Sequence, residues 1–125
     1  MLQFICYPRC STCRKAKAWL DENGIEYEER NIAVDNPTED ELRLWWRLGQ
    51  QPLKKFFNTS GLKYKELKLK DRLPEMDEDD MLELLATDGM LVKRPILAIG
   101  NMGALVGFNE EEWNIHLEWF RSLQK

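Results

Sequence analysis

The sequence predicts an α/β fold with a mixed β-sheet, and two observations carry that prediction. Short apolar segments of strand length stand near both ends of the chain, with segments of helical spacing beside them. A long stretch with helix signals and no strand pattern separates the two ends. The predicted order is strand, helix, strand, a helical block, then strand, strand, helix. Strand–helix–strand units give parallel neighbours and hairpins give antiparallel ones, so this sheet should be mixed and four-stranded.

The N-terminal part is predicted to form the strand–helix–strand unit. The apolar run Leu2–Tyr7 is the first strand, and a helix follows from about Ser11 to Asn23. Gly24 comes next, and glycine is the usual residue just past a helix C-terminus. The alternating segment Ile25–Ile32 is the second strand.

A mostly helical block is predicted from about residue 38 to residue 89. Thr38 and Glu41 have the spacing of a capping box, and Gly49 ends the helix that they begin. Asp77 is a plausible N-cap of the last helix in the block. The segments after the first helix are a short helix at 52–57, a turn at 64–69 and a helix at 77–86.

The C-terminal part is predicted to form a hairpin and a final helix. The strands are Ile96–Gly100 and Ala104–Phe108, and Gly103 in the turn between them can take a positive φ. Asn109 and Glu112 have capping-box spacing at the start of the helix. Its inward apolar positions are Trp113, Leu117 and Phe120.

Composition limits the class of protein. The chain has 125 residues, 43% of them hydrophobic, which predicts a single domain over residues 1–125 with the helical block inserted at about 38–89. The net charge of −4 argues against direct nucleic-acid binding, because neutralising phosphates needs a basic face. The first apolar run is too short to cross a membrane. Three cysteines and the lack of a secretory signal favour the reducing cytoplasm.

Cys10 and Cys13 are the candidate reactive residues, at the junction between the first strand and the first helix. Cys10 lies nearer the N-cap, so its sulfur faces unpaired backbone N–H groups and the positive end of the helix dipole. Both stabilise a thiolate and lower the cysteine pKa. Cys13 lies inside the first turn and is the candidate resolving thiol. This spacing at such a junction indicates a redox motif.

Two other interpretations of the cysteine pair stay open, namely inert buried thiols and half of a zinc site. A structural zinc site has four ligands, and only Cys6 and His116 remain as further cysteine or histidine candidates. Cys6 is expected in the core because it lies within an apolar strand. His116 is expected to be a packed helix residue, and nothing brings it specifically to Cys10. We therefore expect no bound metal or cofactor.

Arg94 is a second candidate, in the segment Lys93-Arg94-Pro95-Ile96. Its permanent charge could pair with a thiolate or an oxyanion, although an ordinary surface arginine is an equal alternative. Pro95 stands at the entrance to a strand, where a missing N–H is tolerated. By base rate alone the bond between Arg94 and Pro95 would be trans.

Four segments together resemble the arsenate reductase family of the ArsC, Spx and YffB type, and the resemblance covers essentially the whole chain. It implies a thioredoxin-like fold with a helical insertion, a cis proline before the third strand and a bacterial, cytoplasmic protein. The segments are Tyr7–Ala16, Glu29–Ile32, Lys93–Ile96 and Val106–Glu110.

The resemblance also implies roles for residues. It places Cys10 at the family's catalytic cysteine and Arg94 at an arginine that holds the oxyanion in arsenate reductases. It makes the bond before Pro95 cis. The substrate-binding residues that we expect are Ser11, Thr12, Arg94 and Pro95.

The chain departs from both familiar branches of the family. Arsenate reductases of this type bind the oxyanion with three arginines, and our alignment puts Asn58 and the Ala104-Leu105 region at two of them. Arg9 and Arg14 flank the cysteine motif and could compensate. The Spx-type regulators bind the RNA polymerase α subunit through a surface with a glycine after the second long helix. Here Pro52 stands at that place, with Gly49 nearby.

The function that we expect is that of a thiol–disulfide oxidoreductase and poor arsenate reductase, with Cys10, Cys13 and Arg94 as catalytic residues. Its substrate would be a disulfide of a protein or small molecule, and its reductant thioredoxin, glutaredoxin or a low-molecular-weight thiol. One alternative is an Spx-like redox-sensing transcriptional regulator that binds RNA polymerase. Another is a true arsenate reductase coupled to glutaredoxin or thioredoxin.

Overall fold

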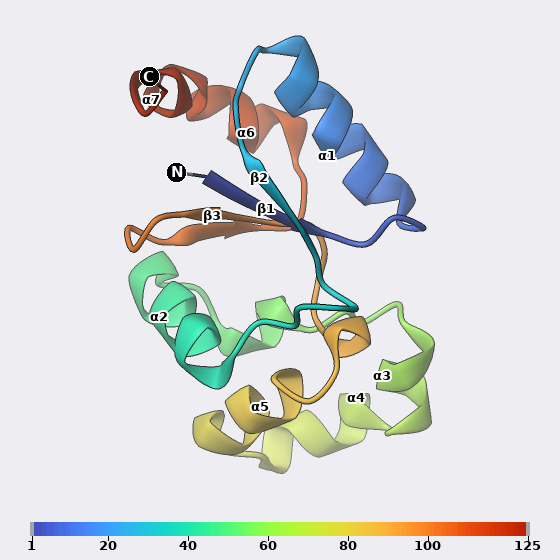
Figure 1. Cartoon of the computed structure of the whole chain (residues 1–125). Coiled ribbons are helices and arrows are strands. Elements are labelled where there is room, and N and C mark those ends of the chain that lie inside the picture. The colour runs from blue at the N-terminus through green and yellow to red at the C-terminus, as the bar shows by residue number, and fades with distance from the viewer. Residues whose placement is uncertain (1, 125) are drawn as a thin grey trace.

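The structure is a computed structural model that describes residues 2–124, and a four-stranded sheet lies between two layers of helices (Figure 1). The strand order is β2-β1-β3-β4. β1 (Leu2–Cys6) is parallel to β2 (Glu28–Asn31) and antiparallel to β3 (Ile96–Ile99). β3 pairs antiparallel with β4 (Ala104–Val106). The predicted α/β class and mixed sheet are confirmed.

Three helices cover one face of the sheet, as Figure 1 shows: α1 (Ser11–Glu22), α6 (Glu110–Ile115) and α7 (Leu117–Ser122). The single final helix that the sequence predicts is thus divided in two. The division falls at His116, whose N–H donates to the carbonyl of Trp113, three residues back, at 3.1 Å. Such a bond tightens the last turn and ends the α-helical ladder.

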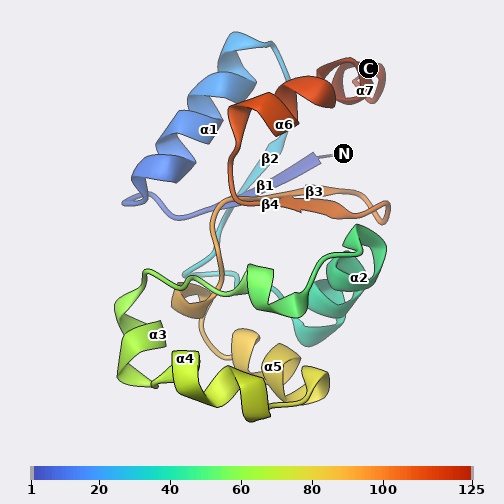
Figure 2. The same cartoon turned by 180° about the vertical axis from the view of Figure 1, so that it is seen from behind.

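The helical block covers the other face of the sheet (Figure 2). Its longest helices are α2 (Glu39–Gly49) and α5 (Glu78–Leu85). Between and after them lie shorter elements: η1 (Leu53–Phe56), α3 (Leu62–Glu66), α4 (Leu69–Arg72), η2 (Leu73–Glu75) and η3 (Gly89–Leu91).

The turn expected at 64–69 is wrong in extent, because α3 and α4 occupy most of it. The chain turns only around Lys68, which takes a left-handed conformation at φ 55°. Tyr64 and Leu69, on either side, are both buried in the core. Burial of these two anchors holds one short helix on each side of the turn.

The alternation of side chains divides the core between the two faces. Phe4 and Leu97 pack on the side of α1 and α6, whereas Ile5 and Ile96 pack on the side of the helical block. This is the period of two that a β-strand imposes. The sheet therefore has an apolar layer on both faces.

The helix caps follow the sequence signals. Thr38 and Glu41 form a reciprocal capping box, in which each side chain bonds the other residue's N–H. Asp77 accepts from the N–H of Asp80 at 2.8 Å. Asn109 accepts from the N–H of Glu112 at 3.0 Å, which is one half of the capping box that the sequence predicts there. These bonds satisfy N–H groups that a helix start leaves open.

All four strands are shorter than the sequence indicates, and for β2 and β4, which lose most, the hydrogen bonds show why. The N–H of Ile25 donates to the carbonyl of Leu20 at 3.0 Å, which continues the end of α1 and delays β2. Gly107, which follows β4, has a φ of 78°, and its N–H donates to the carbonyl of Pro95 at 2.7 Å. A left-handed residue cannot continue a strand, and glycine adopts it without penalty.

One isolated bridge ties the helical block to the entrance of β3. Phe57 and Val92 pair in antiparallel fashion. The N–H of Asn58 donates to the carbonyl of Leu91, and the N–H of Lys93 donates to the carbonyl of Phe56, both at 2.8 Å. Residues 57–60 are thereby held beside residues 93–94. Among the described residues, no helix is long and apolar enough to cross a membrane.

Candidate functional site

A pocket of about 300 Å³ lies at the N-terminus of α1, where four separate segments meet. The β1–α1 connection, the segment after η1, the residues before β3 and the residues after β4 each supply part of its wall. The residues that line it are Cys10, Thr12, Phe57, Asn58, Thr59, Ser60, Lys93, Arg94, Gly107 and Phe108.

Cys10 is the N-cap of α1, as the sequence predicts. Its φ is −89°, and its Sγ accepts a hydrogen bond from the backbone N–H of Cys13 at 3.3 Å. The N–H of Cys10 donates to the carbonyl of Tyr7 at 3.0 Å, which fixes the loop before the helix. The sulfur is only partly buried and lines the pocket. It therefore combines access with a donor aimed at it.

The surroundings of Cys10 lower its pKa below that of an ordinary cysteine. Partial burial opposes ionisation, but hydrogen bonds from the thiol and backbone N–H of Cys13 outweigh it, and hydrogen bonding and charge from Arg94 add to them. A donor and a cation both stabilise the thiolate. The thiolate is the form that attacks disulfides.

Cys13 has the opposite electrostatics three residues along the same helix. It is 3% exposed, and burial raises its pKa to about 12, with hydrogen bonding to Cys10 and the charge of Cys10 acting in the same direction. The N–H of Tyr7 donates to its Sγ at 3.5 Å and offsets part of that rise. Cys13 therefore holds its proton more tightly than Cys10 does.

Arg94 reaches the pocket from the residue before β3, and three contacts orient it. Its Nη1 donates to the carbonyl of Gly89 at 3.3 Å and lies 3.7 Å from the Sδ of Met90. Its guanidinium carbon lies 5.4 Å from the centroid of the Tyr7 ring. The bond between Arg94 and Pro95 is cis, as the family resemblance implies and the base rate does not.

The other predicted substrate-binding residues differ in position. Thr12 lines the pocket, whereas Ser11 is exposed and does not. Pro95 is buried behind the wall, where its carbonyl receives the N–H of Gly107. Of this set, the structure brings Thr12 and Arg94 to Cys10.

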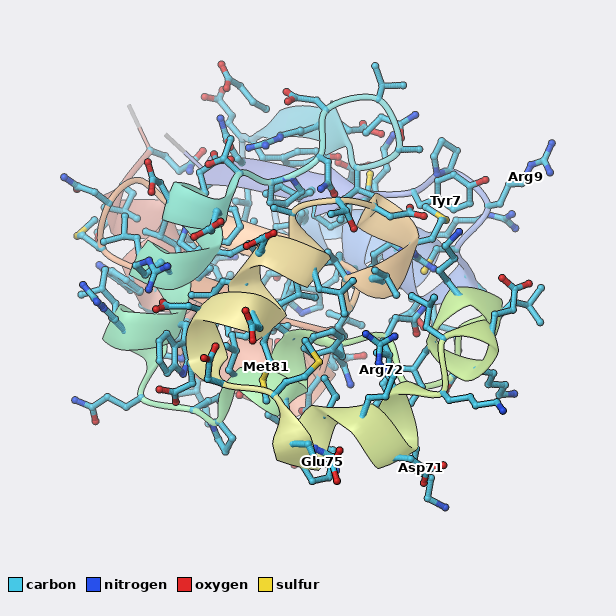
Figure 3. The ribbon with its side chains drawn as sticks, turned by 90° about the horizontal axis from the view of Figure 1, so that it is seen from below. Tyr7, Arg9, Asp71, Arg72, Glu75 and Met81 are labelled. Atoms are coloured by element: carbon cyan, nitrogen blue, oxygen red, sulfur yellow. The ribbon has the colours of Figure 1, made fainter. Side chains whose placement is uncertain are left out.

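The flanking arginines do not face the pocket. The side chain of Arg9 extends away from the body of the molecule (Figure 3). The Nε of Arg14 donates to the carbonyl of Pro8 at 3.3 Å. Asn58 lines the pocket, as its alignment with an oxyanion-binding arginine suggested. From the last strand, however, the lining residues are Gly107 and Phe108 rather than Ala104-Leu105.

Sequence reasoning missed Lys93, Thr59 and Ser60 as parts of the pocket wall, and it reached Asn58 only through the family alignment. Lys93 stands next to Arg94 in a segment that the sequence already marked, so that position was a usable signal. The segment Asn58–Ser60 gives no local signal, because only the Phe57–Val92 bridge brings it to Cys10.

Cys6 and His116 lie apart from the pocket. Cys6 is 5% exposed, its Sγ lies 3.7 Å from Oε2 of Glu29, and burial together with that carboxylate raises its pKa to about 11. The ring of His116 packs on Trp119 and Phe120. Across residues 2–124, no cluster of three or more cysteine, histidine or acidic side chains could hold a metal ion.

Comparisons with known proteins agree with this fold. The chain is 52% identical to the uncharacterized protein YusI of Bacillus subtilis over 90% of this chain and 94% of that one. It is 34% identical to the global transcriptional regulator Spx of Staphylococcus aureus, over 90% and 83% of the two chains. A crystal structure of an ArsC-family-related protein from Bacteroides fragilis superposes with a TM-score of 0.87 at 55% identity, covering 91% of this chain and 95% of that one.

The architecture is the thioredoxin-like fold of these structural relatives, with the helical block between β2 and β3. The model of the ArsC family matches residues 6–115, which include both cysteines of the motif and Arg94. The chain belongs to the ArsC family.

Proposed function

We propose that this protein is a thiol–disulfide oxidoreductase in which Cys10 attacks and Cys13 resolves. One observation carries the proposal: Cys10 caps α1 and lines the pocket, whereas Cys13, in the first helical turn, is 3% exposed, and these surroundings shift their pKa values in opposite directions. Neighbouring titratable groups whose environments push their pKa values apart are assigned to different roles on that ground. Cys10 is then the nucleophile, and Cys13 is the resolving thiol, which stays protonated until the second exchange.

The reaction balances in two exchanges. The Cys10 thiolate attacks one sulfur of the substrate disulfide, a mixed disulfide with Cys10 forms, and the first thiolate leaves. Cys13 then loses its proton and attacks Sγ of Cys10, which forms the 10–13 disulfide and releases the second thiol. Two electrons pass to the substrate, and thioredoxin, glutaredoxin or a low-molecular-weight thiol returns them.

Arg94 has a stabilising role in this scheme. Its charge favours the Cys10 thiolate before attack, and its position in the pocket wall suits an anionic group of the substrate. The backbone N–H groups at the first turn of α1 add to the same field. The proposal places this chemistry in the reducing cytoplasm.

The test is to trap substrates on a Cys13→Ser variant. With no resolving thiol, the mixed disulfide on Cys10 should persist and be identified by mass spectrometry after acid quench. Cys10→Ser is the matched control and should trap nothing. Equal trapping by both variants, or a mixed disulfide found on Cys6, would contradict the assignment.

A redox-sensing regulator is the second candidate function, because a curated relative at 34% identity is named a global transcriptional regulator. In that case the 10–13 disulfide changes binding to a protein partner, and the RNA polymerase α subunit is the partner that the resemblance implies. A pull-down with the reduced and the oxidised protein separates the candidates. Capture of that subunit in one redox state favours the regulator, and turnover of a disulfide without such capture favours the enzyme.

A further inference from the structure

Three lysines beside the Cys10 pocket form no ion pair within residues 2–124. They are Lys54, Lys55 and Lys93, and all are exposed. The protein as a whole carries a net charge of −4, so this surface is a local reversal of sign. We refer to these residues as the lysine strip.

The strip is continuous with the pocket through Lys93. Lys93 lines the Cys10 pocket and also two adjoining hollows of about 300 and 380 Å³. Lys55 lines both of these hollows, and Lys54 lines the larger one. A group bound in either hollow therefore lies next to a molecule whose sulfur meets Cys10.

Packing fixes the stem of Lys93 in this place. A Cβ added at Gly107 would lie 2.8 Å from Cε of Lys93 and 3.9 Å from Nζ, so the lysine stem runs across the bare glycine. Lys93 and Gly107 both line the Cys10 pocket and the smaller of the two adjoining hollows. Within the described chain, Glu112 is the acidic residue that lines these hollows, and it forms no ion pair with the strip.

Resting on the proposed thiol–disulfide activity, we infer that the preferred substrates are small disulfides whose thiol unit carries carboxylate or phosphate groups. The reacting sulfur meets Cys10, and the anionic group lies on the strip over Lys93 and Lys55. Ammonium–anion contacts at an exposed site are weak singly, about fivefold in affinity at most, so several are needed for marked selectivity. Screening by salt should reduce the selectivity.

The chemical reaction is the same two-step thiol–disulfide exchange at Cys10 and Cys13. The Cys10 thiolate displaces one anionic thiolate from the disulfide and forms a mixed disulfide with the other half. Cys13 gives up its proton, bonds to Cys10 and releases that half as a thiol. The strip takes no part in bond making and acts only on binding.

The test compares three disulfides of similar size and different charge: 3,3′-dithiodipropionate, 2-hydroxyethyl disulfide and cystamine. Each single-turnover rate is divided by the rate of the same disulfide with 2-mercaptoethanol, which removes intrinsic reactivity. We expect the normalised rate to be about tenfold higher for the anionic than for the neutral disulfide, and lowest for the cationic one. The anionic preference should shrink in 0.5 M salt.

Variants assign the preference to the strip. Lys93→Gln and Lys55→Gln should each lower the ratio of anionic to neutral rates about two- to fivefold. The ratio cancels any change in the thiolate fraction of Cys10. Lys70→Gln, on α4 and outside these hollows, is the matched control and should leave the ratio unchanged.

Glutathione disulfide and coenzyme A disulfide then distinguish the two anion chemistries. A higher normalised rate with glutathione disulfide indicates that the strip prefers carboxylates, and a higher rate with coenzyme A disulfide indicates that it prefers phosphates. In either case, rates above that of the neutral disulfide support the inference. Equal rates across the charge series, with the disulfides still reduced, would overturn the inference and leave the oxidoreductase standing. Failure with these disulfides while a protein disulfide such as that of insulin is reduced would also overturn the inference, and failure with both kinds would overturn the oxidoreductase itself.

Discussion

The guanidinium carbon of Arg94 lies 5.4 Å from the centroid of the Tyr7 ring, and the backbone N–H of Tyr7 donates to Sγ of Cys13. Tyr7, in the β1–α1 connection, therefore contacts both Arg94 and Cys13, the two residues that stabilise the Cys10 thiolate. A cation over an aromatic face is attracted by about 0.5–2 kcal/mol, depending on its exposure. Tyr7 thus positions the charge that, after the hydrogen bonds from Cys13, helps to lower the pKa of Cys10.

We predict that Tyr7→Leu raises the pKa of Cys10, because Arg94 loses the ring that holds it near the sulfur. Tyr7→Phe keeps the ring and is the matched control, with a pKa close to that of the wild type. The rate of alkylation of Cys10 against pH measures both. A leucine variant that titrates like the wild type would show that Arg94 is held by Gly89 and Met90 alone.

The ion pair between Arg30 and Glu41 stabilises the fold, and we predict that breaking it lowers the free energy of unfolding. The guanidinium of Arg30 donates to both carboxylate oxygens of Glu41, each at 2.9 Å, and its side chain is 10% exposed. Glu41→Gln should lower the free energy of unfolding by about 1–3 kcal/mol, because the partly buried Arg30 loses one of its two carboxylate partners and keeps only the exposed Asp35. Urea denaturation measures the change.

The matched control for that variant is an exposed ion pair. Lys17 and Glu29 pair at 2.9 Å but are 45% and 46% exposed, so Lys17→Gln should cost about 1 kcal/mol or less. Arg30 holds the pKa of Glu41 below its usual range, so the stability from this pair should fade as pH falls through that lowered value. Equal costs for the two variants would contradict the burial argument.

The buried thiol of Cys13 should make stability depend on alkaline pH. Its pKa is about 12 in the folded chain, against about 8.5 for a free cysteine. Between these values the unfolded chain binds fewer protons, so the free energy of unfolding falls as pH rises. The difference in stability between the wild type and Cys13→Ser should therefore narrow above about pH 9, as measured by denaturation at each pH. A constant difference would indicate no such shift.

Arsenate should be a poor substrate. An arsenate dianion needs charge-assisted donors, each contributing about 1.5–3 kcal/mol, and Arg94 is the one arginine among the residues that line the pocket. The absence of two arginine contacts weakens binding by about 3–6 kcal/mol, or two to four orders of magnitude. Lys93 offers a single, flexible ammonium in partial compensation. Coupled assays with glutaredoxin and thioredoxin measure the turnover.

An added arginine should recover part of that loss. Asn58→Arg should improve the use of arsenate about tenfold, whereas Asn58→Gln, which adds length without charge, should not. Robust turnover of sub-millimolar arsenate by the wild type would contradict the argument and restore the reductase activity.

The sequence predicted the parts of the site that local chemistry determines. The position of Cys10 at a helix start, the capping box of Thr38 and Glu41, and the final strands all follow from short-range patterns. The pocket wall formed by the segment after η1 does not follow from short-range patterns, because the bridge that brings Asn58 to the pocket joins two segments that are distant in the sequence. The division of the last helix at His116 likewise depends on one three-residue bond that no apolar period reveals.

The most direct test of the account is the pH dependence of iodoacetamide alkylation, read at each cysteine by peptide mass spectrometry. We predict that Cys10 reacts first, with a midpoint below the value of about 8.5 of a free cysteine, and that Arg94→Met raises that midpoint. Cys13 should stay unmodified until far higher pH. A midpoint for Cys10 at or above the free value, or modification of Cys13 before Cys10, would contradict the central claim that this turn of helix holds one activated thiol and one reserved thiol.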